Sequence, residues 1–219
     1  MTRRFLALCA FAFALALSST QAAAAGAHDW SAITGRTVGT NVDVLNVQAG
    51  WPGLSATWYH GMSPKLDLGG IFTFNYGFEG DVNAPARPGL KLQGLIRGNL
   101  VDTGKFNLGV QFAPGPLVYF FRSDTVGGVA IPIGLAFGIR ATPELNVALA
   151  FELPMFVVFQ SNVLDGQLVL PVLFGGGIEY FFEHNLALTF QLRMGPMIFT
   201  KDDFTDFDFQ ALMGLAFKF

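Results

Sequence analysis

Apolar and polar residues alternate along most of the chain with a period of two. The clearest case is the stretch 207–219, FDFQALMGLAFKF, in which every second position from Phe207 to Phe219 is apolar. The positions between them include Asp208, Gln210 and Lys218. Successive side chains of a β-strand point to opposite faces, so this pattern predicts a strand with one apolar and one mixed face. A helix would scatter the three polar residues around its circumference.

Earlier parts of the chain show the same alternation, in runs that turn residues separate. The predicted strands are 37–49, 54–62, 65–78, 90–100, 105–122, 129–140, 144–160, 167–182, 185–199 and 207–219. The first run is irregular and predicts a bulge near Leu45, and Pro114 and Pro116 predict a bend in the fifth. Most runs are long for a soluble domain, whereas a strand that crosses a bilayer at a tilt needs roughly 9–11 residues.

Short turns and longer polar connections alternate between these runs. The segments SPKLDL, TGKFNL, TPELNV and EHNLAL each place a short turn before an apolar residue, at Leu66, Phe106, Leu145 and Leu186. Their spacing of about 40 residues indicates a repeating pair of antiparallel strands. One end of the sheet is therefore expected to carry short turns and the other loops. About ten strands are expected, or eight if the irregular first pair does not span.

The first 25 residues have the pattern of a secretory signal peptide. Arg3 and Arg4 precede an apolar run over 5–17, and a string of alanines follows it. The predicted organisation is a signal peptide over 1–25, an exposed N-terminal segment over 26–36 and one β-domain over 37–219. The single cysteine, Cys9, falls inside the leader, so the exported chain is expected to have no disulfide.

Composition separates the β-domain from ordinary soluble proteins. Charged residues make up 13% of the chain, about half the usual share, while 52% of it is hydrophobic and 24 residues are Phe. So few charges leave too little polar surface to cover an exported globule, which indicates an apolar environment. Without the two positive charges of Arg3 and Arg4 the formal net charge changes from −3 to −5, which argues against nucleic acid as a partner.

Together these features resemble the small outer-membrane β-barrel proteins of bacteria, which have an even number of antiparallel strands, short turns at one end and loops at the other. The resemblance implies an all-β, closed, antiparallel up-and-down transmembrane β-barrel that is exported to the bacterial outer membrane and surrounded by its lipid. In that family the outer-membrane assembly machinery reads the terminal strand and its final aromatic residue. The resemblance implies this role for Leu215, Phe217 and Phe219. A soluble periplasmic barrel is the alternative.

Six charged residues in the runs are candidates for the inner face, because their parity is opposite to that of the apolar face. They are Asp67, Arg97, Arg140, Glu152, Glu179 and Arg193. A charge that faces lipid costs a few kcal/mol near the bilayer midplane, so these side chains are predicted to line the lumen. Two interpretations follow: the charges pair with one another and close the interior, or they line a polar passage for small solutes.

The sequence offers little for catalysis by a lipid-active enzyme, which would need a histidine near the lipid interface. His28 falls in the exposed segment and His184 in a turn, so both are expected to be solvated, and His60 has the parity of the outer face. No glycine-rich phosphate loop or Cys/His metal set occurs. The sequence therefore predicts neither an enzyme nor a cofactor.

One acidic cluster, Asp202, Asp203 and Asp206, could supply oxygen ligands to a cation, but it lacks an ordered ligand spacing and is interpreted as a solvated loop. No metal site is predicted. The expected role is structural, or that of a narrow passive pore. The alternative is a barrel that binds a small hydrophobic ligand or an external partner through its lumen or loops, and a lipid-modifying enzyme is the least favoured role.

Overall fold

The computed structural model describes residues 28–81, 87–121, 124–161, 166–201 and 204–219. The predicted signal peptide over 1–25 lies outside these residues. Within the described ranges, the chain contains no helix that is long and apolar enough to span a membrane.

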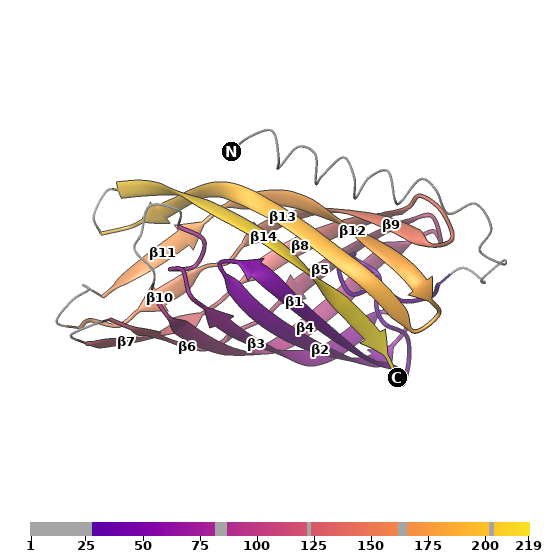
Figure 1. Ribbon diagram of the computed structural model, residues 1–219, viewed down its shortest axis with the longest axis horizontal. Helices are drawn as coiled ribbons and strands as arrows, with labels where there is room; N and C mark the ends of the chain where they lie inside the picture. Colours follow the sequence, from indigo (N-terminus) through magenta and orange to yellow (C-terminus); the bar gives the residue numbers. More distant parts are fainter. Residues whose placement is uncertain (1–27, 82–86, 122–123, 162–165, 202–203) are drawn as a thin grey trace.

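Strands of one antiparallel sheet make up the regular structure. They are β1 (Asp43–Trp51), β2 (Gly53–Ser63), β3 (Leu66–Asn75), β4 (Gly89–Asp102), β5 (Phe106–Phe112), β6 (Gly115–Phe120), β7 (Thr125–Ala130), β8 (Ile133–Arg140), β9 (Leu145–Leu153), β10 (Phe156–Val158), β11 (Gln167–Pro171), β12 (Leu173–Glu183), β13 (Leu186–Phe199) and β14 (Phe204–Lys218). Because β1 pairs with β14, the sheet closes into a barrel with strongly tilted strands (Figure 1).

The fourteen labelled strands make ten crossings of the barrel. Four crossings are each interrupted once and therefore carry two labels, namely β5/β6, β7/β8, β9/β10 and β11/β12. On the side of the loops, the sheet runs through β4, β6, β7, β10, β11 and β13; on the side of the short turns, it runs through β4, β5, β8, β9, β12 and β13. Both halves are therefore closed. The predicted fold class, a closed antiparallel barrel of about ten strands, is confirmed.

Prolines accompany the interruptions. Pro114 lies between β5 and β6, Pro132 between β7 and β8, and Pro154 between β9 and β10. Proline has no N–H to donate to a neighbouring strand, so a ladder of hydrogen bonds stops or bends there. The bend predicted at Pro114 is confirmed, and the later interruptions are features that the sequence analysis did not anticipate.

The predicted alternation of short turns and longer connections is met in part. Short turns of two to four residues join β2 to β3, β4 to β5, β8 to β9 and β12 to β13, and connections of thirteen and eight residues follow β3 and β10. The connections after β6 and β13 have only four residues each, and the one between β1 and β2 consists of Pro52 alone at the loop end. The C-terminus lies at the end that carries the short turns (Figure 1).

The two faces of the sheet are inverted relative to a soluble protein. Large apolar side chains cover the outside, where Phe72 is 48% exposed and Leu92 is 63% exposed. Inside, Asp67, Gln93 and Arg97 are each less than 10% exposed. A soluble domain buries its apolar face and exposes its charges. The arrangement therefore fits a barrel surrounded by lipid, and the alternative of a soluble periplasmic barrel is not supported.

The first predicted strand differs from the structure at its beginning. β1 starts at Asp43 rather than at residue 37, and it pairs with β14 without a register shift from Val44 opposite Lys218 to Trp51 opposite Ala211. The bulge predicted near Leu45 is therefore wrong. The irregular pattern arises because the residues before 43 do not belong to the sheet.

A charge placed on the outer face tests the lipid assignment. Ile96, half-exposed in the middle of β4, and Phe182, exposed near the short-turn end of β12, both face outward. We expect Ile96→Arg to lower the free energy of unfolding by about 2–4 kcal/mol in phospholipid vesicles and Phe182→Arg by about 0–1 kcal/mol, because the penalty falls toward the membrane interface. Urea titration measures both. Equal losses, or a wild-type barrel that stays folded in buffer without detergent or lipid, would contradict the assignment.

Candidate functional site

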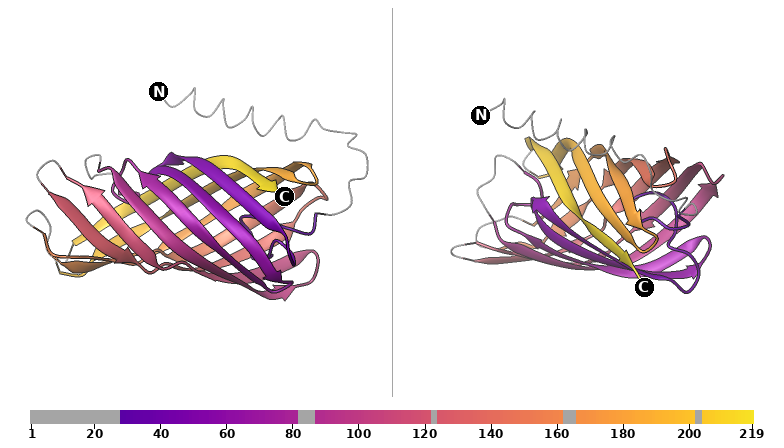
Figure 2. Two further views of the ribbon diagram at one scale, coloured as in Figure 1. Left: turned by 90° about the horizontal axis from the view of Figure 1, so that it is seen from below. Right: turned by 45° about the vertical axis from the view of Figure 1, so that its right-hand side comes forward.

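The N-terminal residues 28–38 fill the lumen at the short-turn end of the barrel, and we call them the plug segment. The indole Nε1 of Trp30 donates to the carbonyl of His184 at 2.9 Å, and the Thr37 hydroxyl donates to the carbonyl of Pro64 at 2.9 Å. Both acceptors lie in short turns on different sides of the barrel. The segment, indigo in Figure 2, thus closes this end.

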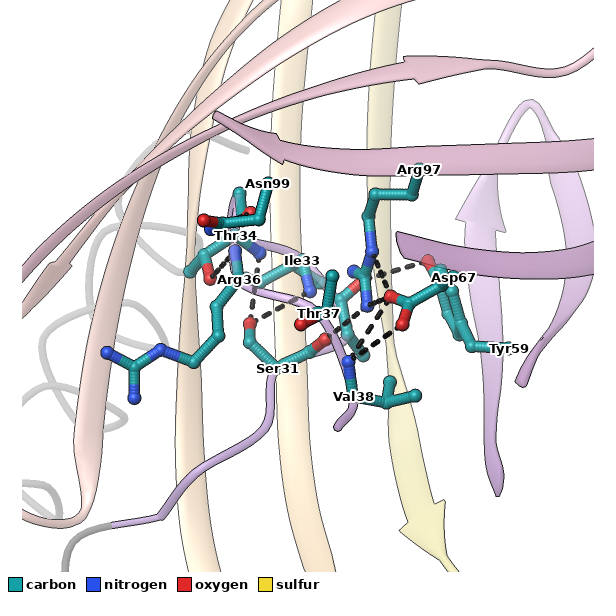
Figure 3. A network of polar contacts seen from close by, with 12 residues as sticks. Ser31, Ile33, Thr34, Arg36, Thr37, Val38, Tyr59, Asp67, Arg97 and Asn99 are labelled. Atoms are coloured by element: carbon teal, nitrogen blue, oxygen red, sulfur yellow. Dashed lines mark hydrogen bonds and ion pairs between the residues drawn. The ribbon is translucent and has the colours of Figure 1, made fainter. Parts of the chain in front are cut away.

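A buried ion pair holds the plug segment to the wall (Figure 3). Arg97 on β4 contacts Asp67 on β3 at 2.6 Å, and both side chains are almost fully buried. The same guanidinium donates to the carbonyl of Ser31 at 2.9 Å, and both Asp67 oxygens accept from the backbone N–H of Val38 at 3.2 Å. The Arg97 guanidinium also lies over the ring of Tyr59, 4.2 Å from its centroid. One ion pair therefore binds the segment at two positions.

A second anchor is Glu179 on β12, which is fully buried. One of its oxygens accepts from the backbone N–H of Ala32 at 2.7 Å and the other from the Asn146 amide at 2.9 Å. Arg140 on β8 donates to the carbonyl of His28. The side chains of Asp67, Glu179 and Arg140 thus meet the plug segment and do not line an open passage.

The prediction of an exposed N-terminal segment over 26–36 is wrong where the structure describes it, and so is the prediction that His28 is solvated. Trp30, Ile33 and Val38 are buried, and the ring of His28 stacks on Phe181 at a centroid distance of 4.0 Å. The physical reason is complementarity. The segment has apolar side chains that gain from burial. Its backbone N–H and C=O groups form hydrogen bonds with the charged side chains of the inner face, which need polar partners inside the barrel.

Glycines allow the plug segment to touch the wall. A Cβ on Gly35 would lie 2.1 Å from the backbone nitrogen of Gly109 on β5, and one on Gly138 of β8 would lie 2.6 Å from the Cβ of Thr34. No side chain fits at such distances. Inward glycines on neighbouring strands were the one sequence signal that could have revealed a segment packed inside the barrel.

Apolar side chains fill the loop end of the lumen, and we call them the loop-end cluster. Its buried members are Phe78, Leu117, Tyr119, Val126, Ala130, Phe156, Val158, Val169 and Met197. They come from β6, β7, β10, β11, β13 and the connection after β3. The ring of Phe78 packs on those of Tyr119 and Phe156, with centroids 4.8 and 5.9 Å apart. Among the described residues, side chains therefore occupy both ends of the lumen.

A cavity of about 170 Å³, which we call the chamber, extends from residues 32–34 of the plug segment to the β1–β2 turn at Pro52. Arg97, Glu152 and Arg193 line it, and Arg193 contacts Glu152 at 3.3 Å. Sequence reasoning missed Glu79 and Lys91, which also line it and form an ion pair at 2.7 Å. Lys91 has the inward parity and could have been found, whereas Glu79 lies just after the predicted strand 65–78, outside the alternating pattern, and is nevertheless only 3% exposed.

The remaining predicted residues lie away from the lumen. Leu215, Phe217 and Phe219 are exposed on the outer face at the C-terminal end of the barrel. His60 also faces outward, and its Nδ1 contacts Asp43 at 3.0 Å. Of the acidic cluster in the last loop, residues 202 and 203 lie outside the described residues. In the part of the chain that the structure covers, no group of three acidic, His or Cys residues is arranged to hold a metal ion.

Comparison with known proteins gives little beyond the fold. No protein-family model and no curated protein matches the chain. Its structure is similar to that of the outer membrane protease OmpT from Escherichia coli, with 8% identity, a TM-score of 0.44 and coverage of 88% of this chain and 100% of that one. It is also similar to a structure described as "Unveiling the Mechanism Behind the in-meso Crystallization of Membrane Proteins", with 14% identity, a TM-score of 0.33 and coverage of 81% and 82%.

Similarity at these levels carries no argument about activity. The closed ten-stranded barrel, its apolar outer face and its polar lumen define the chain as a membrane-spanning β-barrel.

Removing one partner of the buried ion pair tests its importance for the plug segment. We expect Asp67→Asn to lower the free energy of unfolding by about 3–5 kcal/mol, because Arg97 is left buried without a counter-ion. The control is Asp43→Asn, which removes the partly exposed partner of His60 at 3.0 Å, outside the plug segment, and should cost about 1 kcal/mol or less. Urea unfolding in detergent micelles measures both. A loss for Asp67→Asn no larger than for the control would contradict the assignment.

The plug segment should loosen at acidic pH. Burial, and then the positive charge of Arg140, lower the pKa of His28 below its ordinary value of 6.5. The docked segment thus favours neutral His28, while a released segment takes up a proton as the pH falls through 6.5, so docking is strongest above this pH and weakens below it. Hydrogen exchange of residues 28–38 measures this at each pH. In His28→Phe, which keeps the stacking on Phe181, the extra exchange at low pH should disappear; the same pH dependence in both proteins would contradict the role of His28.

Proposed function

We propose that this protein is a structural barrel of the outer membrane whose lumen is closed at rest, so that it does not act as an open passive pore. The observation that carries the proposal is the filling of both ends, by the plug segment at one and the loop-end cluster at the other. A passive pore needs a continuous water-filled path, as in wide barrels whose interior side chains leave a channel.

The pairing of the lumen charges supports the same proposal. Arg193 pairs with Glu152, and Lys91 with Glu79. Charges that select permeating ions must be available to the ion, whereas paired charges in a confined lumen stabilise the wall. The interpretation that the charges close the interior is therefore favoured over a lined passage.

A second candidate is a gated passage, in which the plug segment leaves the lumen. One observation favours it: the plug segment takes no part in the strand pairing of the barrel wall. Hydrogen bonds such as that from Arg97 to the Ser31 carbonyl hold it in the lumen instead. Polar contacts of this kind can be exchanged for water one by one. The gated passage also requires that the loop-end cluster opens.

The other roles considered from the sequence gain less support. A hydrophobic ligand would find amides and ion pairs in the chamber, which suit it poorly. The contacts of His60 fit a structural role at the membrane interface better than catalysis. The His60 ring contacts Asp43, and Asp43 also accepts a hydrogen bond from the Trp58 indole at 3.0 Å. Aromatic rings with one polar atom are common where the membrane meets water. We propose that the protein is not an enzyme.

Export and assembly belong to the same proposal. We infer that the leader over 1–25 is cleaved and that the outer-membrane assembly machinery recognises the end of β14. The exposure of Leu215, Phe217 and Phe219 on the outer face supports this, because their side chains are available to a partner before lipid surrounds them.

Single-channel recording in planar bilayers tests the closed lumen. We expect the mature wild-type protein to give no steady conductance. Deletion of residues 28–38 alone should also be silent, because the loop-end cluster remains, while the deletion combined with Phe78→Ala and Phe156→Ala should conduct, since a polar path then runs through the barrel.

Steady open events in the wild-type protein would overturn the closed lumen. Steady conductance after the deletion alone would favour the gated passage instead. The matched control for the triple change is the deletion combined with Phe72→Ala and Phe174→Ala, which truncates two lipid-facing rings and should stay silent.

A further inference from the structure

The walls of the chamber have two different characters. Small residues form one part of the wall, namely Ala136 on β8, Ala148 and Ala150 on β9, and Gly176 and Gly177 on β12. They leave space beside the longer polar side chains that other strands send inward. Those include the amides of Gln93, Gln111, Gln191 and Gln210. The chamber thus offers an apolar surface together with a polar one.

The charges around the chamber cancel. Lys91, Arg97 and Arg193 each have a carboxylate partner, at 2.7 Å in Glu79, 2.6 Å in Asp67 and 3.3 Å in Glu152. A small anion would have to leave water and break one of these pairs without gaining an unpaired positive charge, and a small cation would meet lining carboxylates, Glu79 and Glu152, that are already paired. The chamber therefore favours a neutral molecule.

The amides supply both donors and acceptors. The Nε2 of Gln93 donates to the carbonyl of Ala113 at 2.7 Å, and that of Gln111 approaches Glu152 at 3.4 Å. Each primary amide has a second N–H and a carbonyl oxygen with two lone pairs, so each of these keeps hydrogen-bonding capacity for a molecule inside. Hydroxyl groups, which donate and accept at once, match such a lining.

The volume limits the size of an occupant. A chamber of about 170 Å³ holds about five or six waters at roughly 30 Å³ each. An apolar cavity of about 150 Å³ in another protein takes up benzene, which shows the scale of molecule that fits. A polyol with a chain of three or four carbons is of this size.

We propose that the chamber binds a small neutral polyol of three or four carbons, with its hydroxyl groups on the glutamine amides and its carbon chain against the wall of Ala136, Ala150 and Gly177. The inference deepens the proposed function, since it rests on the closed lumen described there.

The experiment uses the mature full-length protein, refolded into detergent micelles in the presence of ¹³C-labelled glycerol or erythritol so that the closed lumen can take up the probe. Free probe is then removed by gel filtration, and the ¹³C signal that stays with the folded barrel, followed as a function of the probe concentration during refolding, reports binding. Wild-type protein should give a saturable signal. Ala150→Met fills the chamber and should reduce the affinity at least tenfold, and Gln111→Leu, which removes an amide without closing the space, should reduce it severalfold.

The control is Leu149→Met, the neighbouring residue on the lipid-facing side of β9, which should bind as the wild type does. The proposal is overturned if folded wild-type barrel gives no saturable signal, so that only water occupies the chamber. It is also overturned if Gln111→Leu and wild type give equal signals, or if acetate or methylammonium binds as tightly as the polyols. A silent barrel that binds no polyol loses this inference alone, whereas steady wild-type conductance removes the closed lumen itself.

Discussion

Lipid offers no hydrogen-bond partner to a backbone amide, and the rest of this structure depends on that constraint. Every strand must find both neighbours within the chain, which requires β14 to pair with β1 and the sheet to close. Closure separates an outside that must be apolar from an inside that lipid never reaches. The same rule governs the interruptions near Pro132 and Pro154, where each half of the barrel closes through its own set of strand pairs.

A closed barrel of this size encloses polar side chains but little bulk water, so these side chains need hydrogen-bond partners from the protein itself. The plug segment supplies some of these partners. Its backbone groups satisfy Asp67, Arg97 and Glu179, while its apolar side chains, such as Trp30, replace water that the narrow lumen would otherwise have to order. The loop end follows a different solution, in which aromatic and aliphatic side chains pack on one another. The chamber remains beside residues 32–34 of the plug segment.

Much of this architecture could be predicted from residue order alone, because alternation is a local property of a strand. The number of strands, the parity of Arg97 and Glu152 and the alternation of turns with loops all depend on neighbours within one run. The interior could not be predicted in the same way. Asp67 and Arg97 have inward parity, but their pairing and their hold on Ser31 depend on the register between strands and on a segment that precedes the sheet.

The sequence by itself determined the class of the protein: a period of two, few charges and an apolar face leave a lipid-facing barrel as the physically consistent fold. Tertiary structure decided whether the barrel is empty. Residues 28–38 have no periodic pattern, so nothing local distinguishes an exposed tail from a plug. Their burial follows from long-range complementarity with carboxylates and glycines on strands distant in the chain, such as Glu179 and Gly109. The position of a residue in the alternating pattern determines which face of the sheet its side chain is on, whereas the residue that it contacts there depends on the folded barrel.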